Sequence, residues 1–244
     1  MEIQKALEVL RKGGIILYPT DTVWGIGCDA TDPSAVAKVY EIKKRADSKS
    51  LVLLASDMDM ICRYVREVPE MAVQLVEVND KPMTIIYPSA VTGPSPVIST
   101  PSPAVVGPSS VTAGPSPVAA GQSSVISSPS PVISSEVEKS PHAFPKADRH
   151  CLAFNTVAED GTVGIRIPMM DFCQQLVAKF GRPIVSTSAN ISGEPTPKKF
   201  SEISPEIRDV VDHIVDPSLE RGSTGRSSSI IKVGLDYSIE IIRK

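Results

Sequence analysis

The amino-acid sequence predicts an α/β protein. Amphipathic segments of helical length alternate with short apolar runs of strand length along most of the 244 residues. The connections between these segments are short, which is typical of helices packed on a sheet. One stretch of repetitive composition, 89–149, interrupts the alternation. Because the parts before and after it complete one pattern, we expect a single domain, 1–244, with one insertion.

The part before the insertion begins with a helix. Residues 3–14, IQKALEVLRKGG, carry charges throughout and end in two glycines, which favour helix termination. Asp32 and Pro33 then suit the N-cap and the first position of a second helix. The other elements expected here are strands at 15–18, 51–55 and 83–88 and a helix at 58–76.

The part after the insertion continues the pattern. Gly181 is expected to close a helix that begins near 170, because glycine readily takes the left-handed conformation at a helix end. The remaining elements are strands at 162–168, 183–188, 228–233 and 238–244, and a helix near 205–210. Alternation of this kind predicts an α/β sheet rather than separate helical and β regions.

The insertion consists of seven-residue units that begin at Gly93. They read GPSPVIS, TPSPAVV, GPSSVTA, GPSPVAA, GQSSVIS and SPSPVIS. Proline in nearly every unit excludes a coiled-coil helix, and so much Pro, Ser and Gly cannot bury enough surface to offset chain entropy. We expect a disordered or extended loop. It is either a segment that binds SH3-like partners or is phosphorylated or, the interpretation we favour, a repeat expansion that a surface loop tolerates.

Composition excludes several classes of protein. A net charge of −3, from 25 basic and 28 acidic residues, excludes a globally basic nucleic-acid binder but leaves a local basic groove open. The four cysteines form no CxxC pair, which argues against a zinc site and a disulfide framework. The N-terminal helix lacks the apolar core of a signal peptide, and no run is long enough to span a membrane. We therefore expect a soluble, cytoplasmic protein.

Hydroxyl and cationic side chains follow the predicted strands, where ligands of open α/β sheets bind. The hydroxyls belong to Thr20, Thr22, Thr162, Ser186, Ser188, Thr196 and Ser228, and the cations to Lys43, Arg45, Lys49, Arg166 and Arg243. Such groups bind phosphates and carboxylates. The sequence therefore predicts an anion-binding site at the strand ends.

Each of these groups also has a structural explanation when taken alone. Residues 43–45 could be a solvated helix end, 19–22 a capped turn, and 186–190 a turn that leads into a helix. Arg166 falls between apolar residues of a strand, so its charge requires a partner, and a structural carboxylate is the alternative to a ligand. The functional interpretation rests on all of these groups occurring at strand ends together.

The groups that usually perform covalent catalysis are missing from this pattern. His142 and His150 lie within or beside the insertion, and His213 precedes a strand. No Ser/His/Asp set, metal-ligand spacing, Walker loop or GxGxxG motif occurs. We therefore assign no catalytic residue and no metal ligand. Such a site would act by positioning anions and by electrostatic stabilisation.

Four motifs occur in the order GGIILYPTDTVWGIGCDA, KKRADSKSLVLL, AEDGTVGIRIP and STSANISGEPTP. Together they closely resemble the motifs of the YrdC/YciO family, the threonylcarbamoyl-AMP synthases. The resemblance runs from the first helix to the last strand and omits only the insertion. It implies a twisted, open mixed sheet with flanking helices and a concave anion-binding cavity. It also implies the short form of the family, without the extra C-terminal domain of longer members.

The resemblance further implies a reaction. L-threonine, bicarbonate and ATP, with Mg²⁺, would give threonylcarbamoyl-AMP and pyrophosphate. Transferase proteins would then pass the threonylcarbamoyl group to the tRNA adenosine next to the anticodon, and the enzyme itself would bind tRNA weakly. By match to the motifs, the ATP-binding residues are Lys43, Arg45, Lys49, Thr162, Ser188, Asn190, Thr196 and Arg243. The threonine-binding residues are Thr22, Arg166, Ser186 and Ser228.

Departures from the family pattern are few. Ala46 stands where proline is usual and Trp24 where tyrosine is usual, and no implied charge is lost. Three alternatives remain: a non-catalytic relative that binds tRNA, rRNA or double-stranded RNA, a carbamoyl-transfer domain of the hydrogenase-maturation type, and an inactive descendant. The K-x-R and S-x-N motifs at 43–45 and 188–190 favour the synthase.

Overall fold

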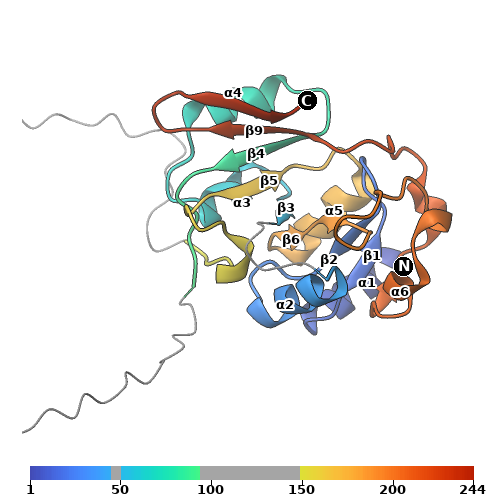
Figure 1. Ribbon diagram of the computed structural model, residues 1–244. Coiled ribbons are helices and arrows are strands. Elements are labelled where there is room, and N and C mark those ends of the chain that lie inside the picture. The colour runs from blue at the N-terminus through green and yellow to red at the C-terminus, as the bar shows by residue number, and fades with distance from the viewer. Residues whose placement is uncertain (45–50, 94–148) are drawn as a thin grey trace, which may run out of the picture. The chain divides into compact units, whose positions relative to one another are not determined.

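The computed structural model describes residues 1–44, 51–93 and 149–244, all of which belong to one compact unit (Figure 1). Most of the predicted insertion, 94–148, lies outside the described residues, as do the predicted site cations Arg45 and Lys49. The described ends of the insertion are hydrogen-bonded to the rest of the chain. The Ala90 N–H donates to the Gly161 carbonyl at 3.0 Å, for example.

The described residues form helices and strands in alternation. The helices are α1 (Glu2–Arg11), α2 (Pro33–Ile42), α3 (Met58–Tyr64), α4 (Glu70–Val78), α5 (Asp171–Phe180) and α6 (Pro205–Arg208), with 3₁₀ turns η2 (Phe154–Thr156), η3 (Phe200–Glu202) and η4 (Pro217–Glu220). The strands are β1 (Ile16–Tyr18), β2 (Gly25–Gly27), β3 (Val52–Leu54), β4 (Met83–Tyr87), β5 (Val163–Arg166), β6 (Ile184–Val185), β7 (Thr187–Ser188), β8 (His213–Ile214), β9 (Ser229–Val233) and β10 (Ile239–Arg243).

Within the described ranges, the strands form two open mixed sheets. The order is β7-β2-β1-β8 in the four-stranded sheet and β10-β9-β4-β5-β3-β6 in the six-stranded sheet. In the larger sheet, β3 runs parallel to β5, with Val52 opposite Gly164 and Leu54 opposite Arg166. The α/β class is confirmed, and the expected open mixed sheet is divided into two.

Two boundaries differ from the sequence-based expectations. The single helix expected at 58–76 is wrong, because the chain forms α3 and α4 with an extended break between them. Val65 in this break is extended and pairs with Ala90, and Pro69 caps α4, since proline starts helices but interrupts their interiors. The strand expected at 183–188 is split at Ser186 into β6 and β7, which belong to different sheets.

Other local signals act as expected. The Asp32 carboxylate accepts hydrogen bonds from the Ser34 and Ala35 N–H groups, at 2.8 and 3.3 Å, and so caps α2. Gly181 ends α5 in the left-handed conformation, with φ 76°. These signals depend on neighbours in sequence, which explains why the sequence alone locates them.

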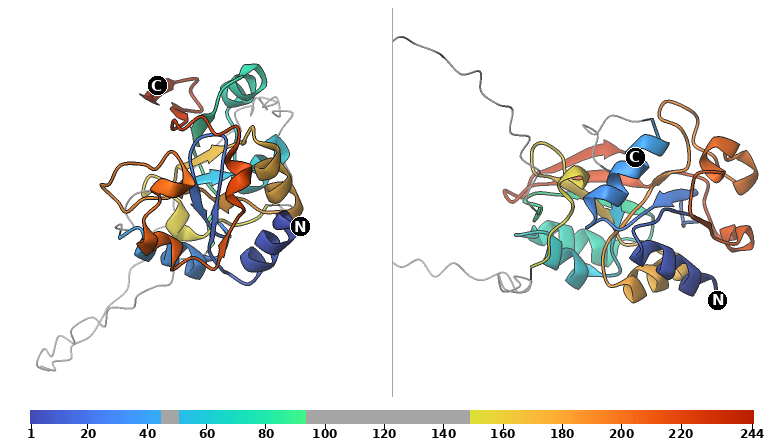
Figure 2. Two further views of the ribbon diagram at one scale, coloured as in Figure 1. Left: turned by 90° about the vertical axis from the view of Figure 1, so that its right-hand side faces the viewer. Right: turned by 90° about the horizontal axis from the view of Figure 1, so that it is seen from below.

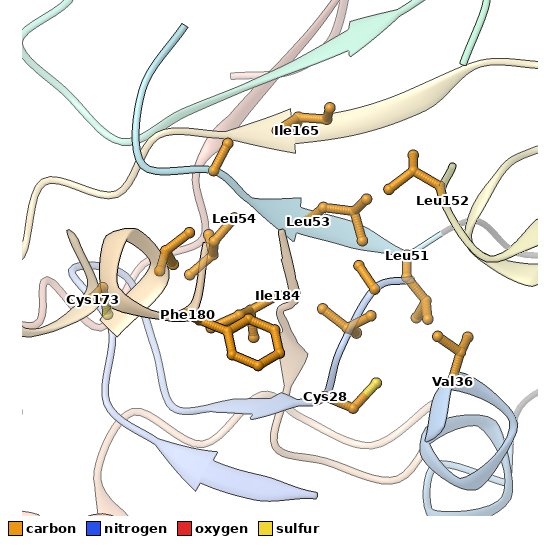
Figure 3. Packing of buried hydrophobic residues seen from close by; sticks show 14 of the residues in the cluster. Cys28, Val36, Leu51, Leu53, Leu54, Leu152, Ile165, Cys173, Phe180 and Ile184 are labelled. Atoms are coloured by element: carbon orange, nitrogen blue, oxygen red, sulfur yellow. The ribbon is translucent and has the colours of Figure 1, made fainter. Parts of the chain in front are cut away.

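The hydrophobic core lies between the helices and the strands. Figure 3 shows Ile184 of β6 beside Phe180 of α5, and the same core includes Leu53 of β3, Ile165 of β5 and Val36 of α2. Helix α1 packs beside α5 (Figure 2). Among the described helices, none is long and apolar enough to cross a membrane.

Candidate active site

A polar cavity of about 270 Å³ has a wall built from both sheets. Half of the predicted site residues line it: Thr22, Arg166, Ser186, Ser188, Ser228 and Arg243. The rest of the described lining is Thr20, Val23, Trp24, Gly25, Val52, Thr187, Ser227 and Ile230. The fold therefore brings hydroxyls and cations from distant strand ends to one site.

The turn between β1 and β2 presents two buried threonine hydroxyls. Thr20 donates its only hydroxyl proton to the Val23 carbonyl at 2.7 Å, so the 2.8 Å contact with Thr22 uses the Thr22 proton. The Thr22 carbonyl accepts a hydrogen bond from the Gly225 N–H at 2.8 Å. Thr22 is thus fixed from both sides, and its oxygen keeps acceptor capacity for groups in the cavity.

Arg166 ends β5 and is only 4% exposed. Its Nη1 donates to both carboxylate oxygens of Asp21, at 2.5 and 2.6 Å, and Nη2 donates to Thr22 Oγ1 at 3.4 Å. A structural carboxylate partner is therefore present, and the guanidinium lines the cavity as well. The two interpretations of Arg166 that the sequence left open are compatible.

The loop after β7 is closed by Lys43 and Asn190. The buried Lys43 ammonium donates to the carbonyls of Ser188 and Asn190, at 2.5 and 2.8 Å. Ser188 Oγ donates to Asn190 Oδ1 at 2.5 Å, and Asn190 Nδ2 donates to the Glu194 carbonyl at 2.7 Å. Lys43 and Asn190 do not line the cavity, but both bind Ser188, which does.

The C-terminal hairpin supplies the remaining polar groups. Ser228 Oγ and Thr84 Oγ1 of β4 are 2.8 Å apart, and Arg243 Nε donates to the Ser228 carbonyl at 2.9 Å. Burial lowers the pKa of Arg243 from its ordinary value, although arginine remains cationic at any physiological pH. Arg243 thus adds a second guanidinium to the cavity.

Thr162 and Thr196 are described but do not line the cavity. Thr162 precedes β5, whereas Arg166 ends it, and four residues of strand span roughly 13 Å. Asp160 Oδ1 accepts hydrogen bonds from the Thr162 hydroxyl at 2.6 Å and the Thr162 N–H at 3.1 Å. Thr196 is half-buried in the chain segment that follows the loop after β7.

The environment of Thr162 predicts a pH effect on stability. Hydrogen bonds from Thr162 and then from Lys232 lower the pKa of Asp160 to about 2. A carboxylate with a lowered pKa stabilises the fold above its unfolded pKa, and this contribution is lost as the pH falls toward the folded value. At pH 7 the Tm of the wild type should exceed that of Asp160→Asn by no more than about 3 °C, because the ion pair of Asp160 and Lys232 is half-exposed. This difference in Tm should disappear between about pH 4 and pH 2. Thermal unfolding of both proteins across that range checks this, and a gap that persisted at pH 2 would contradict it.

Sequence reasoning assigned no role to several groups that shape the cavity. Trp24 lines it, and its indole N–H donates to Glu220 Oε2 at 2.8 Å. The same oxygen accepts from the Phe200 N–H at 3.0 Å, and the rings of Trp24 and Phe200 are 5.1 Å apart. Glu220 and Phe200 come from segments far along the chain, so no local signal could have found them.

The described lining contains no His, Cys, Lys, Asp or Glu. Tyr18 and Cys173 lie close by in the core, and burial raises the pKa of the Tyr18 hydroxyl and of the Cys173 thiol far above their ordinary values. Both groups are therefore neutral at pH 7. The hydroxyls of the described lining have no general base beside them, and the arrangement is suited to holding anions in place.

Fold and site together define an α/β protein with a cavity of hydroxyls and guanidinium groups whose wall comes from two open mixed sheets. The family model for Sua5, YciO and YrdC, described as "Telomere recombination", matches residues 8–114 and 123–244. The chain belongs to this family.

Individual relatives agree with this membership. The threonylcarbamoyl-AMP synthase of Stenotrophomonas maltophilia is 25% identical over 225 residues, which cover 92% of this chain and 88% of the relative. YciO of E. coli has a similar structure, with a TM-score of 0.64 at 20% identity over 99% of this chain and 88% of YciO. Sua5 of P. abyssi, solved in complex with L-threonine, gives a TM-score of 0.62 at 22% identity over 95% of this chain, which spans about half (50%) of the length of Sua5.

Proposed function

We propose that this chain synthesises threonylcarbamoyl-AMP from L-threonine, bicarbonate and ATP, with release of pyrophosphate. The observation that carries the proposal is the buried guanidinium of Arg166 in a cavity whose described lining offers hydroxyls and a second arginine but no nucleophile with a base. The relatives named threonylcarbamoyl-AMP synthase and the complex of Sua5 with L-threonine support it.

In this proposal, threonine binds around Arg166. The guanidinium holds the substrate carboxylate, because an arginine fork matches a carboxylate in geometry and charge. Thr22 accepts a hydrogen bond from a donor group of threonine, since its own proton is already used by Thr20. Ser186 and Ser228 contribute further hydroxyls to the same side of the cavity.

ATP occupies the side of the site defined by the loop after β7 and by Arg243. Ser188 and Arg243 line the cavity, while Lys43 and Asn190 belong to the loop framework behind it. Thr162 and Thr196 lie beyond the cavity, where an extended nucleotide could reach them. Arg45 and Lys49, outside the described residues, remain proposed phosphate ligands. Mg²⁺ enters with ATP and is held by the phosphates rather than by a protein cage.

The chemistry then requires no covalent intermediate on the protein. The threonine amine and bicarbonate combine to form a carbamate with loss of water. A carbamate oxygen attacks the α-phosphorus of ATP, the bond from that phosphorus to the bridging oxygen breaks, and pyrophosphate leaves. The protein holds mutually repelling anions together and stabilises the charge on the reacting phosphate.

The product would serve the threonylcarbamoyl modification of the tRNA adenosine next to the anticodon, through transferase proteins in the cytoplasm. Weak binding of tRNA by this chain remains a prediction. Mixed anhydrides of carbamate and phosphate hydrolyse readily, so a direct passage of the product to the transferase is favourable.

Omission of single substrates tests the proposal. Purified protein is incubated with ATP and Mg²⁺, and pyrophosphate is measured with both threonine and bicarbonate, with either one alone, and with neither. Release only when both are present is the expected result. Release that ignores threonine would point to another adenylation reaction. If no pyrophosphate is released under any condition, the synthase is rejected and the non-catalytic, RNA-binding alternative is favoured.

Removal of the repetitive segment should leave the activity intact. The Gly93 N–H donates to the Leu152 carbonyl at 3.0 Å, so the described chain leaves and returns at neighbouring positions. A short linker can therefore join them, and it lowers the entropic cost of closure by roughly 2 kcal/mol. With 94–148 replaced by a short Gly/Ser linker, kcat and both KM values should stay within about twofold of the full chain.

The pyrophosphate assay also shows what would contradict this prediction. A tenfold or larger change in either KM would make the segment part of the site. The linker chain should also unfold at a temperature no lower than that of the full chain, and that comparison controls for damage to the fold.

A further inference from the structure

Asp21 lies behind Arg166 and is not part of the cavity lining. Its side chain is almost fully buried, and both of its oxygens accept hydrogen bonds from Nη1 of Arg166, at 2.5 and 2.6 Å. Asp21 lines a separate cavity of about 580 Å³ instead, together with Asp80 and Phe172. Arg166 is the cavity-lining side chain that the Asp21 carboxylate contacts.

The backbone around Asp21 is fixed as well. The Asp21 carbonyl accepts a hydrogen bond from the Thr224 N–H at 3.0 Å, and the Thr20 carbonyl accepts from the hydroxyl of Ser223 at 2.5 Å. The carboxylate thus sits on a turn that is tied to a second chain segment. This fixed carboxylate at Nη1, together with the contact from Nη2 to Thr22, limits how the guanidinium can turn.

We propose that Asp21 is a positioning residue that turns one edge of Arg166 toward the substrate carboxylate and cancels its net charge. This inference rests on the proposed function. A guanidinium carries five N–H groups. Asp21 accepts from Nη1 with both oxygens and Thr22 accepts one N–H of Nη2, while among the described residues no acceptor meets the other N–H of Nη2 or that of Nε. These two N–H groups form the side-on fork that binds a carboxylate in two places.

The cancelled charge also selects among anions. An unpaired guanidinium in a confined site attracts every anion, and most strongly the multiply charged phosphates of ATP and pyrophosphate. A guanidinium already paired with Asp21 keeps its directional fork but loses much of this general attraction. Asp21 therefore favours a planar carboxylate over phosphate at this position, which suits a cavity that must hold threonine beside ATP.

Asp21→Asn separates this role from the others. The variant keeps the shape of the side chain but leaves the charge of Arg166 uncompensated and its guanidinium poorly oriented. We expect the KM for threonine to rise roughly 10- to 100-fold, and the KM for ATP to change less than about threefold. The inhibition constant for pyrophosphate should fall at least about threefold, because the unpaired cation now attracts it. Asp80→Asn, in the same second cavity but without contact to Arg166, is the matched control and should leave all three constants unchanged.

A double-mutant cycle with Arg166→Gln decides whether Asp21 acts through Arg166 alone. In the Arg166→Gln background, Asp21→Asn should change the threonine KM by less than about twofold. The double variant should also unfold at a higher temperature than either single variant, because neither charge is left buried without a partner. If Asp21 were merely structural, Asp21→Asn would raise the KM values for threonine and ATP equally and would destabilise the wild type and Arg166→Gln to the same extent. Either result would overturn the inference.

The test remains decisive if the proposed function fails. Trp24 lines the cavity and is the single tryptophan of the chain, so its fluorescence reports binding of inorganic pyrophosphate without any turnover. Tighter pyrophosphate binding by Asp21→Asn than by the wild type would support the inference even in an inactive protein. Equal or weaker binding would overturn it. Absence of pyrophosphate release by the wild type bears on the synthase proposal alone.

Discussion

Replacement of Arg166 by glutamine should reduce kcat/KM for threonine by at least about 100-fold, the equivalent of about 2.7 kcal/mol, while ATP binding changes little. The guanidinium is buried, lines the cavity, and is the proposed ligand of the threonine carboxylate. Glutamine keeps a polar group of similar length but loses the charge and the fork. Steady-state kinetics with threonine and ATP varied separately measure both constants.

The same variant should be less stable than the wild type. Asp21 would be left buried without its cation, and breaking a buried pair from one side costs about 3–5 kcal/mol. Arg166→Lys is the matched control, since it keeps the charge for Asp21 and loses only the planar fork. It should recover most of the stability and little of the threonine use. Equal loss of threonine and ATP use in Arg166→Gln would contradict the assignment of Arg166 to threonine.

Replacement of Lys43 by methionine should act on the other substrate. The ammonium joins the carbonyls of Ser188 and Asn190, and methionine would remove this link, leaving the Ser188 carbonyl only its hydrogen bond from the Asn190 N–H. The loop that supplies Ser188 to the cavity would then shift, and its proposed contact with ATP would weaken. We expect the KM for ATP to rise roughly 10- to 100-fold and the KM for threonine to rise far less. Loss of the buried hydrogen bonds should cost about 1.5–3 kcal/mol for each charged contact.

Lys44→Met is the matched control for this variant. Lys44 follows Lys43 directly, but its side chain is 67% exposed and pairs with Glu206 on the surface at 3.1 Å. Exposed pairs of this kind contribute little to stability, so Lys44→Met should leave both KM values and the Tm almost unchanged. Similar effects from the two lysines would mean that the loss of positive charge, rather than the closure of the loop, explains the Lys43 result.

The sequence predicted those elements whose signals are local. Apolar runs located β1, β4 and β9, and an N-cap and a terminal glycine located the ends of α2 and α5. Strand β2 was missed because Gly25 and Gly27 disfavour strands by composition. Gly27 is nevertheless required there, since a Cβ would lie 2.6 Å from the Tyr18 ring and 2.8 Å from the Val185 carbonyl.

Elements that depend on distant partners could not be predicted. Strand β8 is two residues long and pairs with β1. It is held in place partly by the Asp212 carboxylate, which accepts a hydrogen bond from the Ile15 N–H at 2.7 Å. Nothing in the residues around 213 indicates this pairing. The break between α3 and α4 likewise depends on the pairing of Val65 with Ala90, in addition to Pro69.

The site shows the same division. The position of hydroxyls and cations after strands was enough to select Thr22, Arg166 and Ser228, all of which line the cavity. The partners that fix them, Asp21 and Thr84, were not selected, because contacts between residues far apart in the sequence produce no recognisable sequence motif. Sequence patterns identify the groups that face a ligand more readily than the groups that hold them.

The most direct test of the account is to identify the product. The protein is incubated with ATP, Mg²⁺, L-threonine and ¹³C-labelled bicarbonate, and the quenched mixture is analysed by mass spectrometry. We expect threonylcarbamoyl-AMP that carries the label in its carbamoyl group, formed together with pyrophosphate by the wild type and strongly reduced with Arg166→Gln. Formation of pyrophosphate and AMP that does not depend on threonine and bicarbonate, or an adenylate without the label, would contradict the claim that this cavity joins threonine, bicarbonate and ATP.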